Sequence, residues 1–296
     1  MGYQKFQNRG GAVRIDLGDL NPKQKLFCQS RSRYTAYGGA RGGGKTHVLR
    51  IKAFGGALTY PGIRILIVRK EYPELEQNII LPMRKLIPPE LAAYNGTMRM
   101  MFFANGSVIK FGHYGPNDDD EYQGVEYDWI FMEEATQFSE RQFRTLGACL
   151  RGATKVPRRM YLTCNPGGIG HMWVKRLFVD REYRDGEKPE DYTFIPATVD
   201  DNPQLLEASP EYKQMLDLCR RTCGGPGAMA TGTPWLGPSS RSSAGRPMWS
   251  RPFGASPGSG GSTGSLTMAW ICSPAFGSRW TTTGGPMYTG RSSKAG

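Results

Sequence analysis

The stretch GARGGGKT, from Gly39 to Thr46, constrains what this chain can fold into more than any other feature. It fits the pattern G-x-x-x-x-G-K-[ST] and lies between a strand-like run at 34–37 and a helix-like run at 47–58. Glycines in such a loop let backbone N–H groups turn inward around phosphate oxygens, and the following helix adds its positive end. The pattern therefore predicts a nucleoside-triphosphate site; the alternative is a glycine-rich turn that matches by accident.

The side chains of this loop have separate expected tasks. Lys45 would bridge the outer phosphates and stabilise charge during phosphoryl transfer, and Thr46 would ligate Mg²⁺. The residues expected to hold the nucleotide here are Gly39, Gly42, Gly43, Gly44, Lys45 and Thr46.

A second feature is an apolar run that ends abruptly in two acids. The run from Tyr127 to Glu134 reads as a buried strand that ends in the acids Glu133 and Glu134. Ligands gather at the carboxyl ends of parallel strands, so we expect Glu133 in the metal shell and Glu134 where it polarises the attacking water. The alternative is a solvated helix start at 133–137. The phosphate-binding loop upstream favours the catalytic interpretation.

The order and spacing of several motifs resemble the large terminase subunit of tailed bacteriophages, a DNA-packaging motor. The resemblance covers about residues 20–218. Its motifs are YQGVEYD at 122–128 leading into EEATQF at 133–138, LIVRK at 66–70 before YPEL at 72–75, LTCNPGG at 162–168 and IPATVDDNP at 195–203. One departure is Glu133, which stands where such proteins usually carry Asp, and its longer side chain puts the metal geometry in question.

The resemblance implies further site residues. Gln24 would read adenine through its amide, although it also fits a capped helix start at 21–22. Thr163 and Asn165 resemble a coupling motif that senses the γ-phosphate, although 165–168 equally fits a strand-ending turn. Arg41 is a candidate for stabilising transition-state charge in cis. Secondary candidates for that task, or for acting on a neighbouring subunit, are Arg69, Arg144 and Arg151.

The predicted fold is α/β: a P-loop NTPase of the RecA/ASCE type with a mainly parallel sheet flanked by helices. It would occupy residues 21–218, after an N-terminal arm at 1–20. The expected elements are a strand at 64–69, a helix at 71–86 broken near Pro82, a hairpin at 98–111 turning at Asn105–Gly106, a helix at 139–150 capped by Ser139, a strand at 158–163 and a helix at 170–179.

The composition changes sharply in the last part of the chain. Residues 222–296 contain no Asp or Glu and are dominated by Gly, Ser and Pro. Such a segment cannot bury enough apolar surface to offset its chain entropy, so we expect a disordered, low-complexity tail at 219–296. The resemblance implies a ribonuclease H-like nuclease domain in this place. Since the tail lacks the required strand-borne aspartate, nuclease activity is expected to be absent.

A frameshift is our proposed origin of the tail. Reading from the third base of each codon turns Met268–Ala269 into Gly and Trp270–Ile271 into Asp, whatever synonymous codons are used. With favourable codons, 266–276 becomes an alternating strand that opens with an acid, as the resemblance implies for the nuclease. The alternative is a genuine low-complexity linker.

Charge and cysteine content bound the remaining possibilities. The chain carries 38 Lys and Arg against 26 Asp and Glu, and the tail supplies half of the excess. Phosphate contacts to DNA would come from basic pairs such as 158–159 and 175–176 and would weaken steeply with salt.

The 6 cysteines show no CxxC pairing, and neither a secretory signal nor an apolar run of ~20 residues is visible. We expect a protein of the host bacterial cytoplasm.

Together these features predict an ATP- and Mg²⁺-dependent motor that moves double-stranded DNA into a procapsid. The resemblance implies a small terminase subunit, the portal protein and a homo-oligomeric ring as partners, no membrane, and no place in the mature virion. The alternatives are an inert nucleotide-binding remnant of a decayed prophage terminase and a helicase-like P-loop ATPase. The latter is disfavoured because no second RecA-like domain is present.

Overall fold

The computed structural model describes residues 13–115, 122, 124–152, 154–223, 267–270 and 281–282. By its contacts the chain divides into two units, one formed by residues 20–246 and one by 1–19 with 247–296. In the second unit, β1 (Val13–Asp16), β10 (Thr267–Trp270) and β11 (Thr281–Thr282) form an antiparallel sheet in the order β1-β10-β11. Beyond Cys223, the six described residues of the expected disordered tail thus pair as strands; the rest of the tail beyond Cys223 lies outside the described residues.

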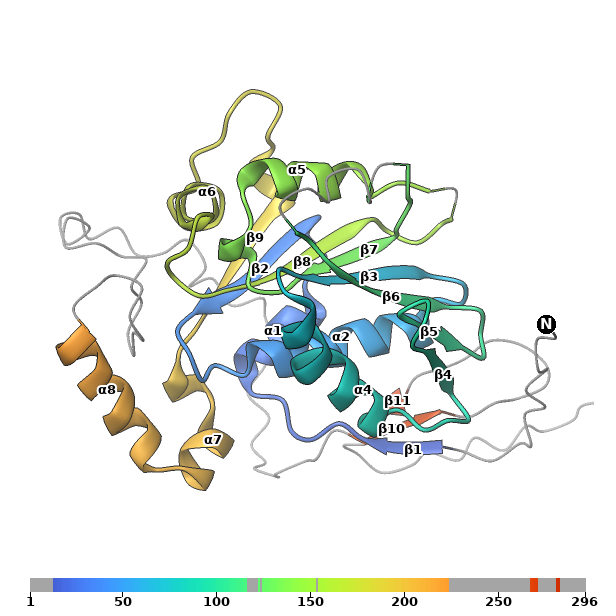
Figure 1. Ribbon diagram of the computed structural model, residues 1–296, viewed down its shortest axis with the longest axis horizontal. Coiled ribbons are helices and arrows are strands. Elements are labelled where there is room, and N and C mark those ends of the chain that lie inside the picture. Colours follow the sequence, from blue (N-terminus) through green and yellow to red (C-terminus); the bar gives the residue numbers. More distant parts are fainter. Residues whose placement is uncertain are drawn as a thin grey trace, which may run out of the picture. The chain divides into compact units, whose positions relative to one another are not determined.

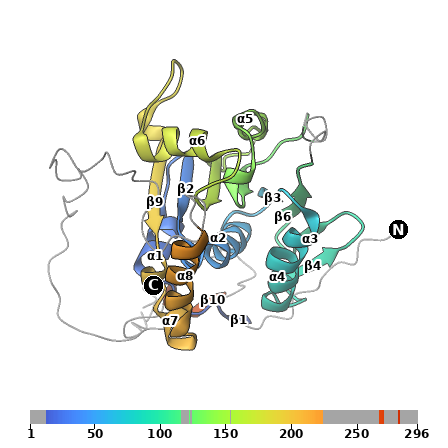
Figure 2. The same cartoon turned by 60° about the vertical axis from the view of Figure 1, so that its left-hand side comes forward.

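The larger unit is built on an eight-stranded sheet in the order β4-β5-β6-β3-β7-β8-β2-β9 (Figure 1). Its strands are β2 (Tyr34–Gly39), β3 (Arg64–Arg69), β4 (Ala92–Asn95), β5 (Met100–Phe103), β6 (Val108–His113), β7 (Trp129–Met132), β8 (Arg159–Cys164) and β9 (Tyr192–Ala197). The pairs from β6 through β9 are parallel, and β4-β5 and β5-β6 are antiparallel. Strands β2 and β9 run side by side in Figures 1 and 2.

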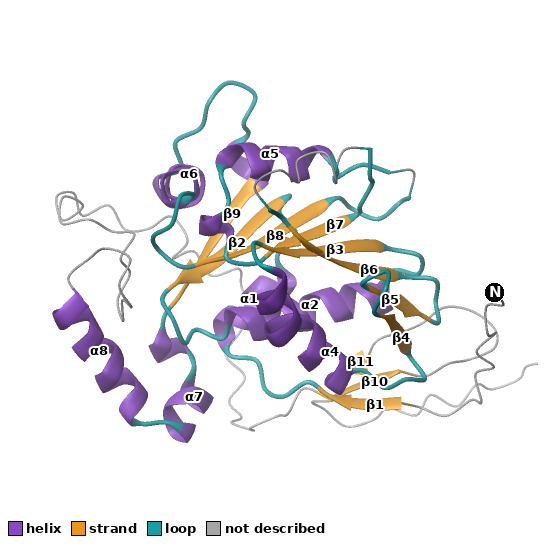
Figure 3. Ribbon diagram, viewed as in Figure 1, coloured by secondary structure: helices purple, strands orange, loops and turns teal. Residues whose placement is uncertain are grey.

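Helices cover both faces of this sheet, with α5 and α6 on one side and α1, α2 and α4 on the other (Figures 1 and 3). The helical segments are α1 (Pro22–Gln29), α2 (Lys45–Thr59), α3 (Tyr72–Leu75), η1 (Glu76–Ile80), α4 (Leu81–Leu86), η3 (Ala135–Gln137), α5 (Glu140–Ala148), α6 (His171–Val174), η4 (Lys175–Asp180), η5 (Pro189–Asp191), η6 (Val199–Asp201), α7 (Pro203–Ala208) and α8 (Glu211–Cys223). The predicted α/β architecture is confirmed. Helix α8 continues past the boundary predicted at residue 218.

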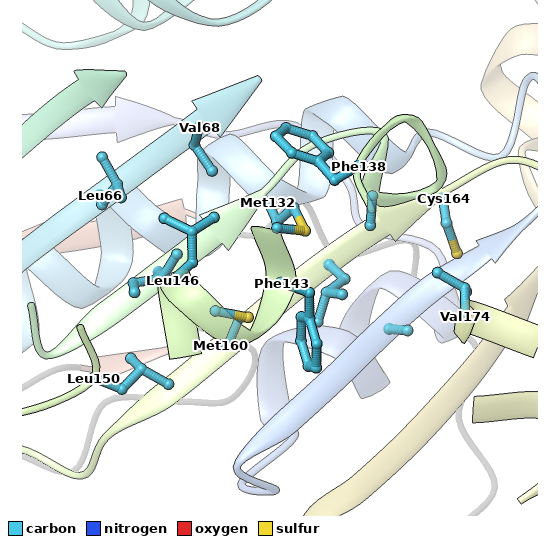
Figure 4. Packing of buried hydrophobic residues seen from close by; sticks show 14 of the residues in the cluster. Leu66, Val68, Met132, Phe138, Phe143, Leu146, Leu150, Met160, Cys164 and Val174 are labelled. Atoms are coloured by element: carbon cyan, nitrogen blue, oxygen red, sulfur yellow. The ribbon is translucent and has the colours of Figure 1, made fainter. Parts of the chain in front are cut away.

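The central strands are apolar because both of their faces are covered. All four residues of β7 are buried, as are five of the six in each of β2, β3 and β8. Figure 4 shows how Leu66, Met132 and Met160, from three adjacent strands, pack against Phe143 and Leu146 of α5. Burying a side chain of this size stabilises the fold by about 1.5–3 kcal/mol.

The helix expected to break near Pro82 is instead one continuous run through α3, η1 and α4. η1 is a wide π-turn, in which the N–H of Leu81 bonds to the carbonyl of Glu76, five residues earlier. Proline has no N–H for the carbonyl four residues before it. That carbonyl belongs to Asn78, and Arg50 Nη1 of α2 donates to it at 2.7 Å. A donor from another helix therefore satisfies the group that Pro82 leaves open.

None of the helices in the described part of the chain is both long and apolar enough to cross a bilayer.

Candidate nucleotide-binding site

The phosphate-binding loop joins the end of β2 to the start of α2. Gly39 has φ +142°, and a β-carbon there would lie 2.7 Å from the carbonyl oxygen of Ala197. Gly44 has φ +68° and would direct a β-carbon against the amide of Gln24. Glycine suits both positions, because it tolerates a positive φ and has no β-carbon to meet these neighbours. No side chain caps α2, so its first N–H groups are left for a ligand.

Lys45 is buried within this loop, with 8% of its surface exposed. Its Nζ donates to the carbonyl of Ala40. Burial lowers the pKa of the ammonium group, and the nearby carboxylates of Glu134 and Glu133 oppose that shift. A buried cation is stabilised by an anionic partner, and a phosphate group would supply one.

A cavity of about 620 Å³ opens at this edge of the sheet. It is lined by Ala40, Arg41, Gly42, Gly44, Lys45, Thr46, His47, Arg69, Glu74, Glu134, Thr136, Gln137, Asn165, Pro166, Gly167, Gly168 and Tyr212. Eight of the expected site residues, with the secondary candidate Arg69 among them, are therefore brought together around one space. The lining does not include Gly39, Gly43, Gln24, Glu133 or Thr163.

The two residues expected to hold metal meet directly. The hydroxyl of Thr46 donates to Glu133 Oε1 at 2.5 Å, although the two residues belong to different elements of the fold. Glu133 is fully buried. The other oxygen of its carboxylate, Oε2, accepts from Arg69 Nη1 at 2.6 Å.

The sequence predicted Arg69, Arg144 and Arg151 as further sources of positive charge for the reaction. Arg69 lines the cavity but is engaged with Glu133. The other two are absent from the lining: Arg144 pairs with Glu140 and Glu187, and Arg151 lies 3.9 Å from Glu126. Arg41 is exposed at the cavity and is the arginine best placed for its expected task.

Glu134 is held by the two residues of the expected coupling motif. Its backbone is left-handed, with φ +54°, and its N–H donates to Thr163 Oγ1 at 3.1 Å. Asn165 Nδ2 donates to both carboxylate oxygens of Glu134, at 2.7 and 2.9 Å. In this structure Thr163 and Asn165 orient the acid. Asn165 Oδ1 is buried and finds no hydrogen-bond partner among the described residues.

Of the two interpretations that the sequence left open for Gln24, the structure shows the helix cap. Its side chain and that of Asn21 form a capping box at the start of α1, with contacts of 2.9 and 2.8 Å. Its Nε2 also donates to the carbonyl of Gly44 at 3.2 Å. The residue therefore ties α1 to the phosphate-binding loop, and adenine recognition stays a prediction.

Two residues at this edge were missed from the sequence. Asn202 Nδ2 donates to the carbonyl of Gly42 at 2.7 Å, and Tyr212 of α8 lines the cavity. The motif IPATVDDNP contains Asn202, but nothing in its pattern indicates which loop the amide reaches. Tyr212 carries no local signal, because only the packing of α8 brings it here.

The residues present fit a nucleotide with Mg²⁺. The cavity gathers Arg41, Lys45 and Arg69 beside an uncapped helix start, which suits polyphosphate. Thr46 and Glu133 offer the hydroxyl and carboxylate oxygens that Mg²⁺ prefers. The described residues contain no cluster of three His, Cys, Asp or Glu able to hold an ion by themselves.

Solved structures resemble this unit. The large terminase of a thermophilic bacteriophage matches with a TM-score of 0.53 and 17% identity, over 67% of this chain and 50% of that one. Its complex with ATP-γ-S gives 0.51 and 18%, over 69% and 49%. The ATPase domain of the Thermus phage P74-26 large terminase gives 0.53 and 12%, over 73% and 94%. The fold is therefore that of a P-loop ATPase domain, and the chain spans about half of the first of these proteins. None of the curated proteins matches the chain.

The family model described as phage terminase large subunit matches residues 31–222. That span begins before β2, ends in α8, and contains the phosphate-binding loop, the acidic end of β7 and the residues that hold Glu134. More than half of the chain, with all of the sheet that builds the cavity, carries this match, and we conclude that the chain belongs to the phage terminase large subunit family.

Proposed function

We propose that this protein binds ATP with Mg²⁺ and hydrolyses it, as the motor half of a terminase large subunit. The observation that carries the proposal is the convergence of the loop at 39–46 with two acids at one edge of the sheet: Glu134 lines the same cavity as Lys45 and Thr46, and the buried Glu133 accepts a hydrogen bond from Thr46. The likeness to the thermophilic bacteriophage terminase in complex with ATP-γ-S supports it.

The residues divide the work as follows. Lys45 and the first N–H groups of α2 bind the phosphates, and Thr46 and Glu133 would hold Mg²⁺. The bound metal ion supplies charge neutralisation at the transferring phosphoryl group. Glu134, fixed by Asn165, orients the attacking water and accepts its hydrogen bond. Arg41 stabilises negative charge from the exposed side of the cavity.

DNA movement is the second half of the proposal. The chain would translocate double-stranded DNA into a procapsid, with the portal protein, a small terminase subunit and further copies of itself in a ring. This part rests on the family relationship, because three of the four basic residues expected to grip DNA are paired with acids within the fold, and the fourth, Arg159, lies over the ring of Trp129. Arg158 contacts Asp128 at 3.0 Å, Lys175 contacts Asp180 at 2.5 Å, and Arg176 contacts Glu140 and Glu187, both at 2.8 Å.

ATP binding and turnover by the full chain test the proposal. Lys45→Ala should lose nucleotide binding, whereas Glu134→Gln should bind ATP but turn it over at least about a hundredfold more slowly, since general-base assistance contributes that much. Lys85→Ala, at an exposed lysine of α4, is the matched control and should resemble the wild type.

Equal nucleotide affinity in the wild type and Lys45→Ala would overturn the site. ATP binding without turnover in the wild type would favour the remnant of a decayed terminase over a motor.

A further inference from the structure

Arg69 and Glu133 lie side by side at the carboxyl edge of the sheet. Arg69 is the last residue of β3, and Glu133 directly follows β7, the parallel neighbour of β3. The register pairs Val68 with Met132, and the N–H of Glu133 donates to the carbonyl of Val68 at 2.9 Å. The sheet itself therefore places the two side chains next to each other.

Both oxygens of the Glu133 carboxylate have fixed partners. Oε1 accepts from Thr46 Oγ1, and Oε2 accepts from Arg69 Nη1 at 2.6 Å. Only 1% of the Glu133 side chain and 11% of the Arg69 side chain are exposed. A carboxylate this deeply buried needs a cationic partner that donates hydrogen bonds to it. Arg69 is that partner.

Arg69 is itself anchored from outside the pair. Its Nε donates to Glu74 Oε2 at 2.8 Å, and the Glu74 side chain is about half exposed. The planar guanidinium group can serve two carboxylates at once through separate edges, which an ammonium group on a flexible stem cannot do with the same geometry. The contact with Glu74 therefore fixes the orientation of the Arg69 guanidinium group, and the guanidinium group in turn fixes the orientation of the Glu133 carboxylate.

We propose that Arg69 is a positioning residue for the metal site. It binds Glu133 Oε2 and so directs Oε1 toward Thr46, leaving one defined oxygen for Mg²⁺. This inference rests on the proposed function, because it assigns Glu133 and Thr46 to the metal. Arg69 then has a task other than stabilising the transition state. The same contact fixes the position of the Glu133 carboxylate, whose side chain is longer than that of the Asp usual at this place in the family.

A competing account makes the opposite prediction. If Arg69 only occupied the place of the metal ion, removing its charge would leave Glu133 free and would tighten metal binding by Coulomb attraction. If Arg69 positions Glu133, removing it loosens the ligand and weakens metal binding. The direction of the change in metal affinity therefore separates the two accounts.

The experiment measures Mn²⁺ binding to the ADP-bound full chain by electron paramagnetic resonance, and ADP binding in the presence of EDTA. Arg69→Gln should raise the Kd for Mn²⁺ about tenfold or more, as loss of a residue that orients a metal ligand does. Its ADP affinity in EDTA should stay near that of the wild type, because Lys45 and α2 hold the phosphates. The Kd of Arg69→Lys for Mn²⁺ should lie between those of the wild type and Arg69→Gln. Arg64→Gln, at the exposed first residue of the same strand, removes an equal charge and should leave both values unchanged.

An unchanged or lower Kd for Mn²⁺ in Arg69→Gln would overturn the positioning role. Should Arg69→Gln fail to fold, the comparison passes to Arg69→Lys, where a Kd equal to that of the wild type would overturn it as well. A wild-type chain that does not bind ADP at all would instead refute the proposed function, and this inference with it.

Discussion

Single residues around the cavity are held by atoms from distant parts of the chain. Glu134 has a left-handed backbone, and Asn165 contacts its carboxylate. The loop that carries Asn165 is tied back to the segment after Glu134, because Thr136 Oγ1 donates to the carbonyl of Asn165 at 2.8 Å and the N–H of Gly170 donates to the carbonyl of Thr136 at 2.8 Å. Small changes in this loop should therefore reach the carboxylate of Glu134.

Gly168→Ala tests this link. Gly168 has φ +77°, and a β-carbon there would lie 2.5 Å from the carbonyl oxygen of Thr136. Gly186 is a matched control, because it has φ +86° and no atom within 4 Å of its added β-carbon. Urea unfolding should show a loss of about 1–2 kcal/mol for Gly186→Ala from backbone strain alone, and a larger loss for Gly168→Ala. Equal losses of stability in Gly168→Ala and Gly186→Ala would mean that the loop accommodates the added β-carbon without disturbing Thr136.

Lys52 supplies a second prediction at this scale. It is 6% exposed, donates to the carbonyl of Cys28 at 2.6 Å, and its Nζ lies 4.4 Å from the ring centroid of Tyr161 and 5.6 Å from that of Trp129. Burial lowers the pKa of Lys52 to about 8 from 10.5. Between those pH values the unfolded chain binds the proton that the folded one has released, so the free energy of unfolding should rise with pH across that window.

Lys52→Met removes this titration. Relative to the wild type, the variant should be more stable at pH 7, where the wild type bears the full penalty of roughly 3 kcal/mol that such a shift implies, and the difference should shrink as the pH rises from 8 toward 10.5. Comparing the two proteins at each pH cancels the other groups that titrate there. A difference that does not vary with pH would show that Lys52 keeps an ordinary pKa.

The helices next to the site are held in place by burial and by capping. Ten of the fifteen residues of α2 are buried, so the helix is locked between the sheet and its neighbours while its N-terminal end opens into the cavity. On the other face, α5 begins at Ser139, whose hydroxyl accepts from the N–H of Gln142 at 3.2 Å. The side chain of Gln142 returns to the N–H of Ser139 at 3.1 Å. This capping box starts α5 immediately after the segment that carries Glu134.

Ser139→Ala should lower the free energy of unfolding by about 0.5–2 kcal/mol, because the first turn of α5 loses its cap. Ser139→Asp keeps an acceptor in the same place and should retain most of the stability. Thermal or chemical denaturation followed by circular dichroism measures both. Similar losses in the two variants would mean that the cap contributes little beside the packing of Phe143 and Leu146.

At the scale of the whole molecule, one packed unit carries the family's ATPase motifs, and the chain spans about half of the thermophilic bacteriophage terminase that it matches. The expected nuclease region would fall beyond residue 222, where the sequence contains no Asp or Glu. Most of that region lies outside the described residues. The proposed frameshift can be decided directly by the nucleotide sequence across the codons for 217–223, where one inserted or missing base would establish it.

The purified chain should not cleave plasmid DNA with Mg²⁺ or Mn²⁺, because a two-metal nuclease needs several converging carboxylates. An unrelated metal-dependent nuclease under the same conditions serves as the positive control. Nicking that follows the protein through purification and disappears when residues 224–296 are deleted would contradict the prediction.

The sequence by itself determined the local parts of this protein. The glycine-rich loop, the apolar strand that ends in Glu133 and Glu134, and the Ser139 cap could all be predicted, because each is specified by neighbours in sequence. The tertiary structure alone decided that Arg69 pairs with Glu133 and that Tyr212 reaches the cavity. Such contacts depend on which strands lie side by side, and that order follows from burying both faces of the sheet under helices, a condition that no single segment encodes.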